Sequence, residues 1–194
     1  MSTKKLVSAA AAAMLLGMTG VAHAQSEVTY HPLIGLGLTV GGDKVDEARY
    51  TDGTTAKITA GSLAQIYLGF EARFELMTAQ INVGYHFQRA NATNGSLSYE
   101  RYPVELLAHY KLTPQWRIGG GVRRISEAKL NGSGVASGRD LKLGASTGPV
   151  LEAEYLFSPN SGLKARVAKD SYTLSTGKEV DGSHFGVMWT YYFN

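Results

Sequence analysis

Apolar residues recur at every second position in eight separate segments after Gln25, and no segment keeps an apolar period of 3.6 residues. This alternation is typical of β-strands with one apolar and one polar face, so the sequence predicts an all-β fold. The apolar positions are Ile34, Leu36, Leu38 and Val40; Ile66, Leu68, Phe70 and Phe74; Ala79, Ile81, Val83, Tyr85 and Phe87; Tyr102, Val104, Leu106, Ala108 and Tyr110; Trp116, Ile118 and Val122; Leu151, Ala153, Tyr155 and Phe157; Leu163, Ala165 and Val167; Phe185, Val187, Trp189, Tyr191 and Phe193.

The connectors between these segments alternate in length. Asp-Gly and Asn-Gly pairs in the long connectors favour hairpin turns, so consecutive strands are expected to be antiparallel neighbours. Short connectors fall at 75–78, 112–115 and 158–162, and longer polar ones surround 52–53 and cover 91–95, 130–139 and 175–181. We therefore expect one domain: an eight-stranded up-and-down barrel whose strands continue past the apolar band on the long-connector side.

Glycine and aromatic residues indicate that the apolar face points outward. Seven glycines lie on the polar face (Gly35, Gly37, Gly69, Gly84, Gly119, Gly121 and Gly186). The narrow lumen of an eight-stranded barrel needs small residues, whereas a solvent-exposed face has no need of glycine. Eight aromatic residues gather on the apolar face near the short connectors: Phe74, Tyr110, Trp116, Tyr155, Phe157, Trp189, Tyr191 and Phe193. Such a girdle is typical of outer-membrane barrels.

The first 24 residues have the layout of a secretory signal peptide. Lys4 and Lys5 precede an apolar core, and Ala22-His23-Ala24 is a small-x-small cleavage site. The apolar stretch is shorter than the ~20 residues of a membrane-spanning helix. We expect removal of residues 1–24, which leaves residues 25–194 as the barrel domain.

Composition excludes several classes of protein. The 194 residues include no cysteine, which rules out disulfides, cysteine-bound zinc and a thiol nucleophile. Without Lys4 and Lys5, the 19 basic residues fall to 17 against 16 acidic ones, so the exported domain is nearly neutral. A charge this small gives no indication of nucleic-acid binding.

Over nearly its whole exported length, the chain resembles the small eight-stranded outer-membrane barrels of Gram-negative bacteria, the group that includes OmpX, OmpW and the membrane domain of OmpA. The run Phe185-x-Val187-x-Trp189-x-Tyr191-x-Phe193 is similar to the C-terminal signal that their assembly machinery recognises, although here Asn194 follows the last aromatic residue. The resemblance implies a transmembrane barrel with short periplasmic turns and longer extracellular loops. It also implies location in the outer membrane, with outer-membrane lipids, lipopolysaccharide and the barrel-assembly machinery as partners.

With this register, nine charged side chains point into the lumen: Glu71, Arg73, Glu105, Arg117, Arg123, Glu152, Glu154, Lys164 and Arg166. Buried charges persist only when they are paired, so we expect a neutralising network that fills the barrel, with Glu105 and Arg117 as one plausible pair. An ion or proton path is the alternative, although eight strands leave little room for a water column.

The sequence offers no convincing catalytic or metal site. His86 and His109 lack the spacing of a metal-binding motif, and the neighbours Ser183 and His184 would face opposite sides of a strand. We predict no catalytic residue, cofactor or metal, and no enzymatic activity.

Three functions remain open at this stage. The first is a structural or surface-interaction role through the outer loops. The second is OmpW-like passage of small apolar molecules, which needs an apolar pocket in the upper barrel, where the sequence shows no conspicuous inward cluster. The third is a soluble periplasmic, lipocalin-like barrel, which requires the face with Ile34, Leu36 and Leu38 to be interior.

Overall fold

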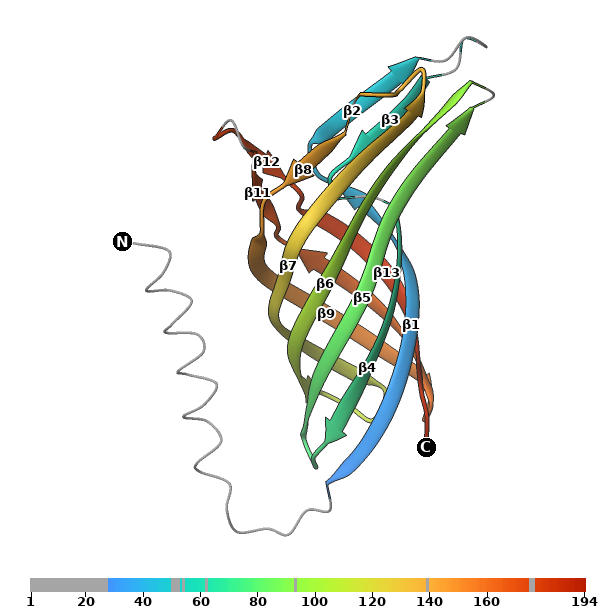
Figure 1. The fold of residues 1–194 in the computed structure, drawn as a ribbon. Coiled ribbons are helices and arrows are strands. Elements are labelled where there is room, and N and C mark those ends of the chain that lie inside the picture. Colours follow the sequence, from blue (N-terminus) through green and yellow to red (C-terminus); the bar gives the residue numbers. More distant parts are fainter. Residues whose placement is uncertain are drawn as a thin grey trace.

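The computed structural model describes residues 28–49, 53, 55–61, 63–92, 94–138, 140–174 and 177–194. The predicted signal peptide lies outside the described residues, as do Asp52, Arg139 and Ser175 of the predicted connectors. No helix in the described ranges is long and apolar enough to cross a bilayer. Eight long strands dominate the fold (Figure 1): β1 (Thr29–Gly41), β4 (Leu63–Arg73), β5 (Met77–Ala92), β6 (Gly95–Lys111), β7 (Trp116–Gly134), β9 (Ser146–Ser158), β10 (Ser161–Ala168) and β13 (His184–Tyr192).

These eight strands close into a barrel. Each pairs antiparallel with the next along the sheet, in the order β6-β5-β4-β1-β13-β10-β9-β7, and a further pairing between β6 and β7 completes the ring. The first and last strands meet from Leu33 opposite Tyr192 to Gly41 opposite His184. The predicted eight-stranded antiparallel up-and-down barrel is therefore confirmed.

Five short strands stand at the long-loop end, above the barrel in Figure 1. They are β2 (Lys44–Arg49), β3 (Thr55–Thr59), β8 (Leu141–Leu143), β11 (Ser171–Thr173) and β12 (Glu179–Asp181). β2 pairs with β3, β11 with β12, and β8 with β7. Residues 91–92 and 130–134, predicted as connectors, are strand, because the β5–β6 and β6–β7 ladders continue to Ala92–Gly95 and Gly95–Gly134.

The apolar face of the barrel points outward. Along β6, Leu106 is 55% exposed while its neighbour Glu105 is 2% exposed. Leu36 and Leu38, on β1, are likewise exposed. The soluble, lipocalin-like alternative needed this face inside, so that alternative is contradicted, and the expected outward-facing apolar wall is observed.

The polarity of the two faces reverses along β6. On the short-turn side, apolar Val104 and Leu106 are exposed and Glu105 is buried. On the long-loop side, Leu97 and Tyr99 are completely buried, and the intervening positions Ser98 and Glu100 are partly exposed. A wall with apolar residues outside suits an apolar surrounding, whereas apolar residues inside suit water. The reversal marks the level at which the surroundings of the strand change.

A β-bulge in β7 keeps this reversal consistent across the sheet. Arg101 lies opposite Ala128 and Pro103 opposite Ile125, so β7 contains one residue more than β6 over this step. The extra residue moves the inward positions of β7 from odd to even numbers. Ala128 and Leu130 consequently face inward beyond the bulge, and both are buried.

Candidate functional site

The short-turn half of the interior contains one arginine between two glutamates. Arg117 Nε donates to Glu154 Oε2 at 2.6 Å, and Arg117 Nη1 lies 2.9 Å from Glu71 Oε2. The Tyr192 hydroxyl accepts a further hydrogen bond from Arg117 and donates to Glu154 Oε1 at 2.8 Å. Arg73, at the barrel rim, pairs with Glu71 at 2.6 Å. These contacts join β4, β7, β9 and β13 through side chains alone.

Glu152, on β9, occupies the middle of the interior. Its Oε2 lies 3.0 Å from His109 Nε2 and 3.3 Å from Lys164 Nζ, and its Oε1 lies 3.1 Å from Arg166 Nη2. Lys164 also donates to Gln80 Oε1 at 3.1 Å. One carboxylate therefore ties together groups from β6 and β10 and, through Lys164, β5.

Two carboxylates serve three arginines in the long-loop half. Glu105 accepts from Arg123 Nη1 at 3.2 Å and from Arg166 Nη2 at 2.9 Å. Asp170 Oδ2 lies 3.4 Å from Arg101 Nη1 and 3.5 Å from Arg123 Nε. All five residues are at most 2% exposed. Burial at this level requires the pairing that the structure shows.

Two neutral imidazoles complete this upper network. Arg101 Nε donates to His86 Nδ1 at 3.1 Å, which assigns the His86 proton to Nε2. His86 Nε2 lies 2.8 Å from the Thr39 hydroxyl, which donates to the Gly61 carbonyl at 2.7 Å. The His184 ring packs edge-on against His86, with 5.3 Å between centroids. Neutral rings accept hydrogen bonds from arginines without adding positive charge.

Eight of the nine charges expected in the lumen are buried inside the barrel, and the ninth, Arg73, is half-buried at the rim. The pair suggested between Glu105 and Arg117 is wrong. The β6–β7 register places Glu105 opposite Arg123 and Lys111 opposite Arg117, because the turn after Lys111 sets the alignment.

Sequence reasoning missed Arg101 and Asp170. Arg101 shares the phase of Glu105 on β6, so extending the alternation toward the N-terminus would have found it. Asp170 follows β10. Every second residue here is buried (Ala168, Asp170 and Tyr172), but these residues are not all apolar, so a search for alternating apolar positions does not find them. Tyr172 accepts a 2.7 Å hydrogen bond from Arg101 Nη1.

An apolar cluster covers the upper network, and it corrects the expectation that no inward apolar group lies in the upper barrel. Residues from all four long connections and their strands contribute: Ile58, Ala60, Leu97, Tyr99, Ile125, Ala128, Leu130, Ala136, Leu143, Tyr172 and Val180. None is more than 7% exposed. The cluster packs at the long-loop end of the barrel.

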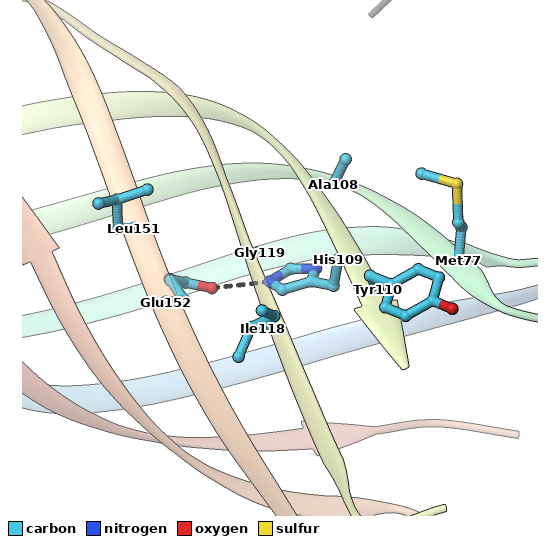
Figure 2. A pocket seen from close by; sticks show the side chains of 8 residues that line it. All are labelled: Met77, Ala108, His109, Tyr110, Ile118, Gly119, Leu151 and Glu152. Atoms are coloured by element: carbon cyan, nitrogen blue, oxygen red, sulfur yellow. Dashed lines mark hydrogen bonds and ion pairs between the residues drawn. The ribbon is translucent and has the colours of Figure 1, made fainter. Parts of the chain in front are cut away.

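A hollow of about 480 Å³ lies on the outer wall. Ala108 and Gly119 leave this part of the wall thin, and Tyr110, Ile118 and Leu151 border it. Figure 2 shows the contact between His109 and Glu152 among these side chains. The side chains around this hollow are apolar except for His109 and Glu152, and these two are already hydrogen-bonded to each other.

Of the residues of the predicted aromatic girdle, five are exposed (Tyr110, Trp116, Tyr155, Phe157 and Phe193) and three are partly exposed (Phe74, Trp189 and Tyr191). Trp116 and Tyr155 lie side by side on β7 and β9, with ring centroids 5.0 Å apart. Tyr191 packs against Phe193 at the same distance. A second aromatic group, not expected from the sequence, lies near the polarity reversal: Tyr85 stacks on Phe87 at 5.0 Å and on Tyr102 at 5.2 Å. The apolar wall is bordered by aromatic rings at both levels on the β5–β6 side.

The described part of the chain contains no group of three histidine or acidic residues placed to hold a metal ion. Of the pair Ser183 and His184, the imidazole points into the barrel, where its Nδ1 donates to the Gly182 carbonyl at 3.0 Å. This hydrogen bond occupies the nitrogen that donates, and Arg123 approaches the other nitrogen at 3.5 Å.

Comparison with known proteins agrees with this architecture. The family model described as the outer membrane protein beta-barrel domain matches residues 8–193. The attachment invasion locus protein Ail of Yersinia pestis, solved with the heparin analogue sucrose octasulfate, is similar in structure, with a TM-score of 0.56, 12% identity, and coverage of 84% of this chain and 96% of that chain. Neisserial surface protein A gives a TM-score of 0.51, 12% identity, and coverage of 84% and 97%. No protein among the curated sequences matches.

Proposed function

The chain belongs to the outer membrane protein β-barrel domain family, and we propose that it is a closed, non-enzymatic barrel that acts at the cell surface through its outer loops. The protein is located in the outer membrane of a Gram-negative bacterium. We infer that the short turns at one end of the barrel face the periplasm and that the long strands at the other end (Figure 1) extend outward.

The filled interior carries this proposal. Arg117, Glu152 and Arg123 occupy successive levels of the lumen, each is at most 6% exposed, and each is paired. The apolar cluster covers the outer end above them. A continuous water column would require these groups to separate, and each unpaired buried charge costs several kcal/mol.

Conductance across planar bilayers tests closure. We expect no unitary current steps from folded protein. Insertion is verified by recovery of the folded band from the lipid vesicles that deliver the protein to the bilayer. The matched opened variant is Arg123→Ser with Arg166→Ser, which removes two long side chains from the upper lumen. Steps from wild-type protein that this double variant enlarges would contradict a closed lumen.

The outer loops offer a partner surface of alternating charge. Lys44 pairs with Glu47 at 3.1 Å and Lys129 with Glu127 at 3.4 Å. Ail was solved with a polyanion, but these paired charges do not favour a polyanion here. The β5–β6 hairpin extends beyond the barrel together with β7 and the β2–β3 hairpin (Figure 1), and we assign the contact surface to the β5–β6 hairpin.

Shortening this hairpin tests the surface role. Ala90 and Leu97 are already paired across it, so replacing residues 91–96 by Asn-Gly preserves the register and supplies a favourable turn. We expect cells with this variant to retain the folded protein but to lose attachment to surfaces and to other cells. Unchanged attachment would contradict the assignment.

Two further partners are proposed, one for the last strand and one for the level at which the outer apolar wall ends on the long-loop side, called the outer border. The alternating aromatic run that ends at Phe193 is proposed to engage the barrel-assembly machinery, and the outer border to contact lipopolysaccharide. Phe193→Ala should lower the yield of assembled protein in cells while leaving refolding of purified protein in detergent unchanged.

The buried apolar cluster favours passage of small apolar molecules as a second candidate. Leu97, Ile125 and Leu143 would have to separate to admit such a molecule. Uptake of a radiolabelled alkane into cells distinguishes the candidates. A closed barrel predicts equal uptake with and without the protein. Passage of apolar molecules through the barrel predicts that uptake depends on the protein and is changed by Leu143→Ser.

A further inference from the structure

Two cations stand on the outer wall just above its apolar band. Arg124 on β7 is exposed and follows outward-facing Val122. Lys169 is exposed and follows outward-facing Val167 at the end of β10. Both lie at the level where the apolar wall ends, and Arg124 stands opposite Val104 on β6, the strand that carries Tyr102. This border is cationic on the β7–β10 side and aromatic on the β5–β6 side.

Strand β9 links the two cations geometrically. Arg124 lies opposite Thr147 and donates from Nη1 to its hydroxyl at 3.0 Å. The Lys169 amide donates to the Pro149 carbonyl, two residues along the same strand. With strands about 4.8 Å apart and a rise of about 3.3 Å per residue, the two Cα atoms are roughly 12 Å apart. Both long side chains can reach one group that lies between them over β9.

Neither cation forms an ion pair with a carboxylate among the described residues of the wall. Among the described residues Arg124 forms no ion pair, and the next acidic residue along its strand, Glu127, pairs with Lys129 at 3.4 Å. Lys169 acts electrostatically on Asp181, which stands above it on β12 and is largely exposed. The wall beneath the two cations consists of Val122, Pro149 and Val167, which are suited to acyl chains.

We propose that Arg124 and Lys169 form a binding site for the phosphate groups of the outer-leaflet glycolipid, lipid A. A phosphate is the group that guanidinium and ammonium ions bind at a membrane surface, and the apolar wall below accepts the attached chains. Arg124 supplies a planar pair of donors, Lys169 a point charge, and Thr147 orients the guanidinium. The site rests on the proposed function, because it requires an inserted barrel with its long loops outward.

The test uses full-length folded protein in detergent micelles, with native mass spectrometry counting bound lipid. The probes are phosphorylated lipid A, the same lipid after removal of its phosphates, and phosphatidylglycerol. We expect wild-type protein to prefer phosphorylated lipid A. Each cation near the surface is worth about fivefold in affinity, so Arg124→Gln with Lys169→Gln should lower binding roughly 25-fold.

The control carries the same change of charge elsewhere. Lys44→Gln with Lys178→Gln removes two exposed cations from the outer loops and should leave the preference for phosphorylated lipid A intact. Equal binding of phosphorylated and dephosphorylated lipid by the wild type would overturn the site. Equal binding of phosphatidylglycerol, or an equal loss in the loop control, would also overturn it. Failure of the protein to insert as a barrel that resists SDS until it is heated would instead count against the proposed function.

Discussion

Arg117 and Glu154 lie directly opposite each other on β7 and β9, and their side chains meet inside the barrel at 2.6 Å. Arg117 also pairs with Glu71, from the other side of the lumen. A shift of either strand by one residue would send one partner into the apolar surroundings. The pair thus links the register of the sheet to the neutrality of the interior.

Removing Arg117 should therefore be costly. Arg117→Leu leaves Glu71 and Glu154 short of a partner in a buried site, and we expect a loss of about 3–5 kcal/mol in the free energy of unfolding. Urea titration of protein in lipid vesicles measures it. The exposed control Arg89→Leu should change stability by less than 1 kcal/mol, since Arg89 forms only a surface pair at 3.9 Å. Equal effects of the two substitutions would contradict the buried network.

Adjacent residues on β6 should have opposite requirements: an apolar side chain at Leu106 and a charged side chain at Glu105. Leu106→Arg places a charge near the middle of the lipid-facing wall and should cost roughly 2–4 kcal/mol. Glu105→Leu adds no lipid contact and leaves Arg123 and Arg166 with one acceptor fewer, so it should also destabilise the barrel. Folding yield into vesicles measures both. Better insertion of Glu105→Leu than of the wild type would mean that the strand is inverted.

Two glutamines distinguish the halves of the lumen. Gln65 Nε2 has no hydrogen-bond partner in the described ranges, and its Oε1 lies 3.5 Å from Arg123 Nη1. Gln65→Glu places a carboxylate beside this arginine and should cost no more than about 1 kcal/mol. Gln80 donates to Glu71, so Gln80→Glu sets two carboxylates together and should cost about 2–3 kcal/mol. Vesicle unfolding curves in which Gln65→Glu is the more damaging change would reject this distribution of charge.

An aspartate outside the barrel gives the loops a pH dependence. Hydrogen bonds from Ser183 lower the pKa of Asp181 below its usual 3.8. The Asp43 amide donates to the Asp181 carbonyl at 2.6 Å and the Asp181 amide donates to the Asp43 carboxylate at 3.0 Å, which joins β12 to the base of the β2–β3 hairpin. Because the pKa is lower in the folded state, this stabilisation is present above pH 3.8 and is lost as pH falls through the folded value.

Amide exchange at Ser183 measures that loss. We expect protection to fall below about pH 4 in the wild type, after correction for the intrinsic pH dependence of exchange. In Asp181→Asn the corrected protection should be independent of pH, because the amide oxygen still accepts but does not titrate in this range. Identical pH profiles for the two proteins would contradict the role of this carboxylate.

The membrane-spanning part of the fold could be predicted because, along the whole of each strand there, one face meets lipid and the other meets the barrel interior. Leu106 meets an apolar surrounding and Glu105 a paired interior, so the alternation is strict. Near the outer border this rule fails. Leu97 and Tyr99 are inside on β6, in the phase of Glu105, because water replaces lipid outside.

The upper network was less predictable because it depends on long-range contacts. The bulge after Ile125 changes the phase of β7, and no local pattern in the sequence announces it. Asp170 reaches Arg101 only after ring closure has placed β10 and β6 on the same lumen, separated by β7 and β9. The apolar cluster likewise unites short segments such as the one around Ile58 that carry too few residues to show a period.

The most direct measurement is the gel mobility of the protein from an outer-membrane fraction, compared with and without boiling in SDS. A closed barrel with its apolar wall in lipid should resist SDS until it is heated, and should then shift to the mobility of the unfolded chain. A protein found instead in the soluble periplasmic fraction, with one mobility under both conditions, would contradict the assignment of the apolar face to the membrane.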